Sequence, residues 1–112
     1  MMRQLNPEEL WEKVRALKGQ TLYTLKRHSP NHVQDVSDME VTISQRSSRL
    51  RRADIVGAYE VVCMSGELRI RAGWKGGPSY LYSLVPAIVL HAVPEQIEKI
   101  TDGGLSGIKL KN

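Results

Sequence analysis

The sequence has one cysteine, no long apolar run and no recognisable metal-binding or catalytic motif. Cys63 has no second cysteine to pair with in the chain, so we expect an intracellular, reducing compartment rather than secretion. The first ten residues lack the apolar h-region of a secretory signal, and the longest apolar stretch, Tyr80–Val93, is shorter than the ~20 residues that a membrane span requires. These absences predict a soluble, cytoplasmic protein with no membrane partner.

The residues that most often carry chemistry are few and separated in the sequence. His28 and His32 have a proline between them and no cysteine or carboxylate cluster beside them, which favours a polar loop over a metal site. His91 lies in an apolar run and is typical of a hydrogen-bonded core or interface histidine. Cys63 lies on the apolar side of its predicted helix, where thiols are usually inert. We therefore expect a protein that is not an enzyme and uses no metal or other cofactor.

Length and composition are those of an ordinary single domain. The chain has 112 residues, of which 41% are hydrophobic and 25% charged. A chain of this size buries roughly two thirds of the surface that it exposes when unfolded, which is enough for one core. No internal repeat, linker or low-complexity segment divides it. We expect one domain over residues 1–112.

The basic excess is concentrated in the middle of the chain. Residues 46–75 contain seven basic side chains and three acidic ones, an excess of four that equals the net charge of +4 of the whole chain. The remaining residues contribute no net charge. Such an asymmetry indicates the kind of partner rather than the fold.

The segment "LNPEELWEKVRALKG" predicts the first helix. Asn6 is a capping residue, Pro7 suits the first helical position, and Glu9 completes a capping-box pattern. Apolar residues follow at helical spacing on one face, and Gly19 provides the left-handed stop. We expect this helix to cover an apolar surface.

Three strands are predicted to follow as an antiparallel meander. They are the β-branched and aromatic "TLYTLKR", the short "HVQDVS" and the alternating "MEVTIS". In the last of these, Met39, Val41 and Ile43 are expected on one face. That alternation predicts a sheet with one solvated face and one face packed on helices.

The second half predicts helices and a final β-structure. "ADIVGAYEVVCMSG" has helical spacing that ends at Gly66, and "ELRIR" is a possible short strand. The apolar run that starts at Ser79 predicts a buried helix that Pro86 ends, kinks or restarts. For the tail we prefer a hairpin turning at residues 102–104 over a short helix followed by one strand. The expected class is α+β: a small antiparallel sheet, made of a three-strand meander plus a C-terminal strand or hairpin, packed against about three helices.

Several of these segments together resemble a known type of protein. "LKGQTLYTL", the strand pair with its serine and arginine connection, "SGEL" and "GPSYLY" look like small α+β proteins carried on mobile elements, including integron gene cassettes. They are also similar to accessory modules found near restriction-type proteins. The resemblance covers most of the chain and departs from the pattern after Gly66. It implies a compact α+β fold, dimerisation, and an accessory or nucleic-acid-related role.

The segment "QRSSRLRRADI" is the main candidate binding surface. We interpret it as a basic connection from a strand to a helix, whose arginines bind phosphate oxygens while neighbouring serines donate hydroxyl groups. The alternative is a solvated loop whose arginines pair with Asp54 or Glu60 or contact a partner subunit. Trp74 is a secondary candidate for stacking. The candidate nucleic-acid-binding residues are Arg46, Arg49, Arg51, Arg52, Lys26, Arg27, Trp74 and Lys75.

Two functional hypotheses follow. The first is a non-enzymatic accessory domain that binds DNA or RNA through the phosphate backbone, without the helix-turn-helix, zinc-finger or RNA-binding signature of sequence-specific readout. The second is a homodimeric protein-interaction module whose interface is the apolar segment 80–93. The two are compatible, since a dimer doubles a basic surface.

Overall fold

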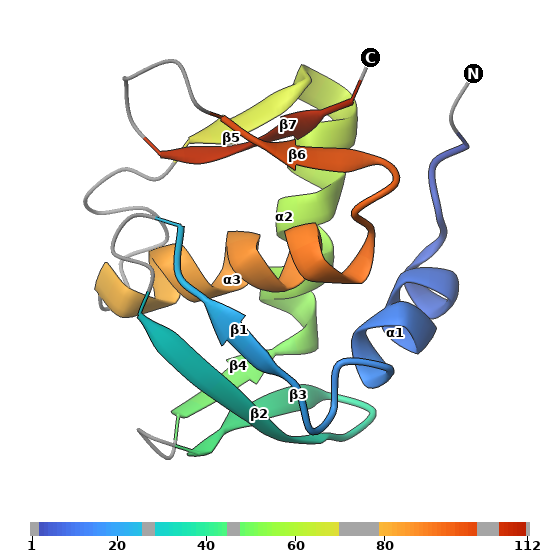
Figure 1. Ribbon diagram of the computed structural model, residues 1–112. Helices are drawn as coiled ribbons and strands as arrows, with labels where there is room; N and C mark the ends of the chain where they lie inside the picture. The colour runs from blue at the N-terminus through green and yellow to red at the C-terminus, as the bar shows by residue number, and fades with distance from the viewer. Residues whose placement is uncertain (1–2, 26–28, 45–47, 70–78, 101–105, 112) are drawn as a thin grey trace.

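Three helices and two antiparallel sheets make up the fold of this computed structural model. The structure describes residues 3–25, 29–44, 48–69, 79–100 and 106–111. The predicted α+β class is confirmed, and Figure 1 shows the two sheets at opposite ends of the molecule with α3 crossing between them. The elements in chain order are α1 (Pro7–Arg15), β1 (Thr21–Tyr23), β2 (Pro30–Val36), β3 (Glu40–Ile43), β4 (Ser48–Arg51), α2 (Arg52–Ser65), β5 (Glu67–Arg69), α3 (Ser79–Ala92), β6 (Ile97–Lys99) and β7 (Gly107–Leu110).

Helix α1 begins as its sequence predicts. The Asn6 side chain accepts a hydrogen bond from the Glu9 backbone N–H, and the Glu9 carboxylate accepts one from the Asn6 N–H, so the capping box is complete. Arg3 also donates to this carboxylate, and these hydrogen bonds lower the pKa of Glu9 to about 2. Leu10, Trp11 and Val14 are buried on one face of the helix. The chain then turns at Gly19, whose φ of 86° is the left-handed conformation that favours glycine.

The first sheet has four strands in the order β1-β2-β3-β4, one more than the predicted meander. Alternation places the apolar residues of its strands on one face, where Leu22, Val33, Val41, Ile43 and Leu50 are buried. Met39 does not belong to this set: it is 70% exposed because the turn before β3 includes it and the strand starts at Glu40. Its predicted inward position is wrong.

The second sheet confirms the hairpin that was preferred for the tail. β6 and β7 pair antiparallel, and β7 pairs on its other side with β5, which gives the order β5-β7-β6. The predicted turn at residues 102–104 lies outside the described residues. β5 is the short strand expected after α2, which ends at Gly66 with a φ of 90°.

Helix α3 forms the centre of the core. It is continuous from Ser79 to Ala92, with Pro86 inside it, so the proline does not divide the apolar segment into two elements. Residues 84–89 are buried, together with Ala92 and Val93, against α1, α2, β1 and the second sheet. Among the described residues, no helix combines the length and the apolar character that crossing a membrane requires.

Helix α2 connects the core to the segment before α1. The Tyr59 hydroxyl donates to Gln96 Oε1 at 2.6 Å and accepts from the Leu5 N–H at 3.0 Å. Gln96 in turn donates to the Arg3 carbonyl at 3.0 Å. Burial raises the pKa of Tyr59 to about 12, so the hydroxyl stays protonated and keeps its donor role.

Candidate nucleic-acid interface

The arginine-rich segment forms an edge strand rather than a connection. β4 pairs along its whole length with β3, from Glu40 opposite Arg51 to Ile43 opposite Ser48. The physical reason is the period of two in "RLR": Leu50 is buried at 2% exposure opposite Val41, so its two neighbours point to the other face. The interpretation of residues 48–51 as a strand-to-helix connection is therefore corrected, because the helix follows directly at Arg52.

Arg49 and Arg51 are presented together to solvent. Their side chains are 70% and 76% exposed, and they lie two residues apart on the same face of β4, a separation of about 7 Å. Arg49 lies 3.6 Å from a Glu40 carboxylate oxygen, and Arg51 lies 3.3 Å from one of Asp54. Exposed ion pairs of this kind contribute only about 0–1 kcal/mol, so a phosphate can replace the carboxylate at small cost.

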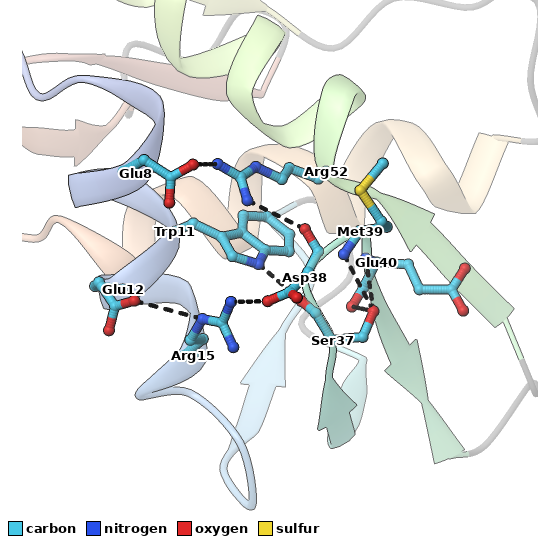
Figure 2. A network of polar contacts seen from close by, with 9 residues as sticks. All are labelled: Glu8, Trp11, Glu12, Arg15, Ser37, Asp38, Met39, Glu40 and Arg52. Carbon is cyan, nitrogen blue, oxygen red and sulfur yellow. Dashed lines mark hydrogen bonds and ion pairs between the residues drawn. The ribbon is translucent and has the colours of Figure 1, made fainter.

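Arg52 has a different position, although it follows Arg51 directly (Figure 2). Its side chain is only 19% exposed and lies over the Trp11 ring, 5.3 Å from the ring centroid. The guanidinium donates to Glu8 Oε1 at 2.7 Å and to the Asp38 carbonyl oxygen at 3.1 Å. It therefore connects α1, the β2–β3 turn and the start of α2, and its donors are engaged in contacts within the protein.

The rest of the network in Figure 2 fixes the β2–β3 turn on α1. The Trp11 Nε1–H donates to the Ser37 carbonyl at 2.8 Å, and Arg15 donates to the Asp38 carboxylate. That hydrogen bond lowers the pKa of Asp38. The Ser37 hydroxyl accepts from the N–H groups of Met39 and Glu40 and closes the turn. The residues drawn here contact one another, so we regard this network as part of the scaffold.

Replacing Arg52 by alanine is expected to lower the free energy of unfolding by about 1–3 kcal/mol. The substitution removes a cation that stacks on the Trp11 ring, and it leaves the Asp38 carbonyl without its hydrogen-bond donor. Arg51→Ala is the matched control, since it removes the same charge one residue away from an exposed position, and we expect a change within about 0.5 kcal/mol. Urea unfolding followed by circular dichroism measures both. Equal effects of the two substitutions would contradict the distinction between them.

Five of the predicted binding residues lie outside the described residues. Their roles in binding therefore stay predictions. These residues are Lys26, Arg27, Arg46, Trp74 and Lys75.

Tyr23 was not among the predicted binding residues, yet it lies on the same face of the first sheet as Arg49 and Arg51. Leu22 is buried, so the alternation of "TLY" turns the Tyr23 ring outward, where the residue is 50% exposed. The sequence contains this signal, because an apolar residue between Thr21 and Tyr23 predicts two outward side chains. That Tyr23 shares a face with Arg49 and Arg51 depends on the order of the strands in the sheet, which the sequence does not provide.

The cysteine and the histidine that the sequence analysis considered for catalysis lie in environments that favour a structural role. Cys63 is half-buried, and desolvation raises the pKa of its thiol, which disfavours the reactive thiolate. The His91 Nδ1–H donates to the Ala87 carbonyl at 2.8 Å, within its own helix. In the part of the chain that the structure describes, no three His, Cys, Asp or Glu side chains form a group that could hold a metal ion.

Comparison with known proteins provides no family for this arrangement. No protein-family model, no curated protein and no solved structure matches the chain. The function of the chain must therefore be inferred from the geometry and chemistry of its own residues.

Proposed function

We propose that this chain is a non-enzymatic accessory domain that binds nucleic acid through the phosphate backbone, with Arg49 and Arg51 as its contact residues. The observation that carries the proposal is the pair of exposed guanidinium groups on one face of an edge strand. A guanidinium donates two parallel hydrogen bonds to phosphate oxygens, and it stays charged at every physiological pH. Two such groups in a row suit a chain of phosphates better than a single small anion.

The charge distribution supports the same proposal. The whole chain has a net charge of +4, and its basic excess lies in residues 46–75, the segment that contains β4. A positive surface attracts a polyanion over a long range and so increases the rate at which the two meet. Contacts to phosphates position a protein without reading bases, so we expect binding with little sequence preference.

The predicted result of changing Arg49 and Arg51 to alanine together is a weaker dependence of binding on salt. Each phosphate contact contributes about −0.9 to the slope of log K against log salt on duplex DNA, so the loss of two contacts makes the slope less negative by about 1.8. Fluorescence anisotropy with a labelled random duplex, measured over a series of salt concentrations, provides the slope.

The control for this experiment removes the same charge elsewhere. Arg3→Ala combined with Lys13→Ala takes two exposed cations from the α1 region, where the side chains are 69% and 44% exposed. We expect this variant to keep a slope near that of the wild type. If the two double variants have the same slope, the effect is one of net charge, and β4 is not the contact surface.

The homodimer with its interface in segment 80–93 stays the alternative. Most side chains of residues 84–93 are buried within one chain, which leaves half-buried Leu90 and His91 as the residues in that range that a second copy can reach. Sedimentation velocity over a range of micromolar concentrations tests it. A strictly monomeric profile would count against this alternative.

A further inference from the structure

The four-stranded sheet has a second, polar face that extends from Tyr23 to the arginines, and we call it the outer face. Each pair of strands is in a register that keeps these side chains on one side, opposite the buried apolar residues. All of them are exposed or half-buried. The outer face includes Thr21 and Tyr23 of β1, Pro30, His32 and Asp35 of β2, Glu40 and Thr42 of β3, and Arg49 and Arg51 of β4, with Pro30 directly opposite Tyr23.

One end of the outer face presents rings. Thr21 is directly opposite His32, so Tyr23, two residues further along β1, is the diagonal neighbour of His32 at about 7–8 Å. The Tyr23 residue is 50% exposed, which leaves much of its ring in solvent. An exposed aromatic ring on the face of a sheet is a surface on which a nucleic-acid base can stack.

The other end of the outer face presents charge. Arg49 and Arg51 lie on β4, three strand spacings from β1, which is about 14 Å across the sheet. Thr42 and Glu40 on β3 and Asp35 on β2 lie between these arginines and β1. The Asp35 carboxylate is 3.3 Å from the Lys18 ammonium nitrogen. The cations that lie on the outer face itself are therefore at its β4 edge, and the rings are at its β1–β2 side.

This separation distinguishes two forms of nucleic acid. In a duplex the faces of the bases are covered by their neighbours in the stack, so a ring on the protein surface has no base face on which to stack. In a single strand the bases can turn away from the backbone and stack on aromatic side chains while the phosphates contact arginines. A surface with a ring at one side and guanidinium groups at the other is complementary to the single strand.

We propose that the ligand of this surface is a single-stranded nucleic acid that crosses the outer face, with a base stacked on Tyr23 and phosphates on Arg49 and Arg51. This inference depends on the proposed function and makes it more specific. It names the class of ligand and adds Tyr23 as a binding residue.

The test compares an oligothymidylate with a duplex of the same length and uses Tyr23→Ala and Tyr23→Phe. We expect the wild type to bind the single strand more tightly. Tyr23→Ala should weaken that binding roughly 5-fold to 150-fold, the range for loss of one base–aromatic stack, and leave duplex binding unchanged. Tyr23→Phe keeps the ring and should bind like the wild type. Thermal unfolding verifies that both variants are folded.

A second measurement locates the contact independently of affinity. An oligonucleotide that contains 5-iodouracil is irradiated in complex with the wild type, and the crosslinked peptide is identified by mass spectrometry. A crosslink at Tyr23 is the expected result. If the wild type binds both nucleic acids but Tyr23→Ala has no effect and the crosslink lies elsewhere, this inference is overturned and the proposed function stands. If the wild type binds neither, both are overturned.

Discussion

Replacing Trp11 by alanine is expected to lower the free energy of unfolding by about 3–5 kcal/mol, the largest effect of any single side-chain truncation that we predict. Trp11 is 1% exposed, and its ring fills the space between α1, the β2–β3 turn and Arg52. Its removal leaves a cavity, removes the surface on which Arg52 stacks, and leaves the Ser37 carbonyl without its donor. Urea unfolding followed by far-ultraviolet circular dichroism measures the change.

Trp11→Phe separates the contribution of the ring's packing from that of its hydrogen bond to the Ser37 carbonyl. It also remains informative if the alanine variant does not fold. The phenyl ring keeps most of the packing but cannot donate to the Ser37 carbonyl, and we expect a loss of about 1–3 kcal/mol. A cost below about 1 kcal/mol for the alanine variant would show that Trp11 does not anchor the turn.

Replacing Gly107 by alanine is expected to disrupt the second sheet. Gly107 lies opposite Arg69 in the central strand β7, and a Cβ at this position would overlap the Leu68 carbonyl oxygen and approach the Arg69 Cα to 2.8 Å. Both obstacles are backbone atoms, which cannot change rotamer to make room. We expect a loss of about 3 kcal/mol or more, at or above the upper end of the usual cost of overpacking, because β5 must separate from β7.

Gly66→Ala is the matched control for that substitution. Gly66 has a φ of 90° but no atom within 4 Å of the added Cβ, so the cost is only that of a left-handed conformation, about 1–2 kcal/mol. In thermal unfolding, the midpoint temperature of Gly107→Ala should lie well below that of Gly66→Ala. The reverse order would contradict the close approach of β5 and β7.

Local signals in the sequence predicted most of the elements. The capping box at Asn6 and Glu9 determined the start of α1, and Gly66 marked the end of α2. The predicted stop at Gly19 is wrong, because α1 already ends at Arg15 and the chain reaches the left-handed turn at Gly19 four residues later. The hairpin of the tail followed from the turn residues around position 103. These features depend on neighbours within a few residues, so the sequence displays them directly.

The parts that were predicted poorly depend on partners far away in the chain. β4 was interpreted as a connection because four arginines in seven positions are typical of solvated segments. The strand forms because Leu50 packs opposite Val41, a contact that requires the sheet order to be known. For Pro86 the sequence left an end, a kink and a restart of the helix open, and the structure has one continuous helix with the proline inside it.

The candidate site was predicted in part for the same reason. Arg49 and Arg51 do lie together on an exposed face, whereas Arg52, one residue later, stacks on Trp11 and donates to Glu8. The contacts that hold Arg52 are made with Trp11, Glu8 and Asp38, which lie far from it in the sequence. Tyr23 belongs to the outer face only through the order of the four strands.

The order β5-β7-β6 has a consequence for the synthesis of the chain. Every strand of the first sheet pairs with the one made just before it, so that meander can assemble while the ribosome is still translating. β5 and β6 have no bonds to each other and must wait for β7, which is made after both. Until β7 pairs with them, both strands have unpaired edges beside the apolar surface of α3. A chain truncated before Gly107 would therefore expose these edges, although its first sheet could already be complete.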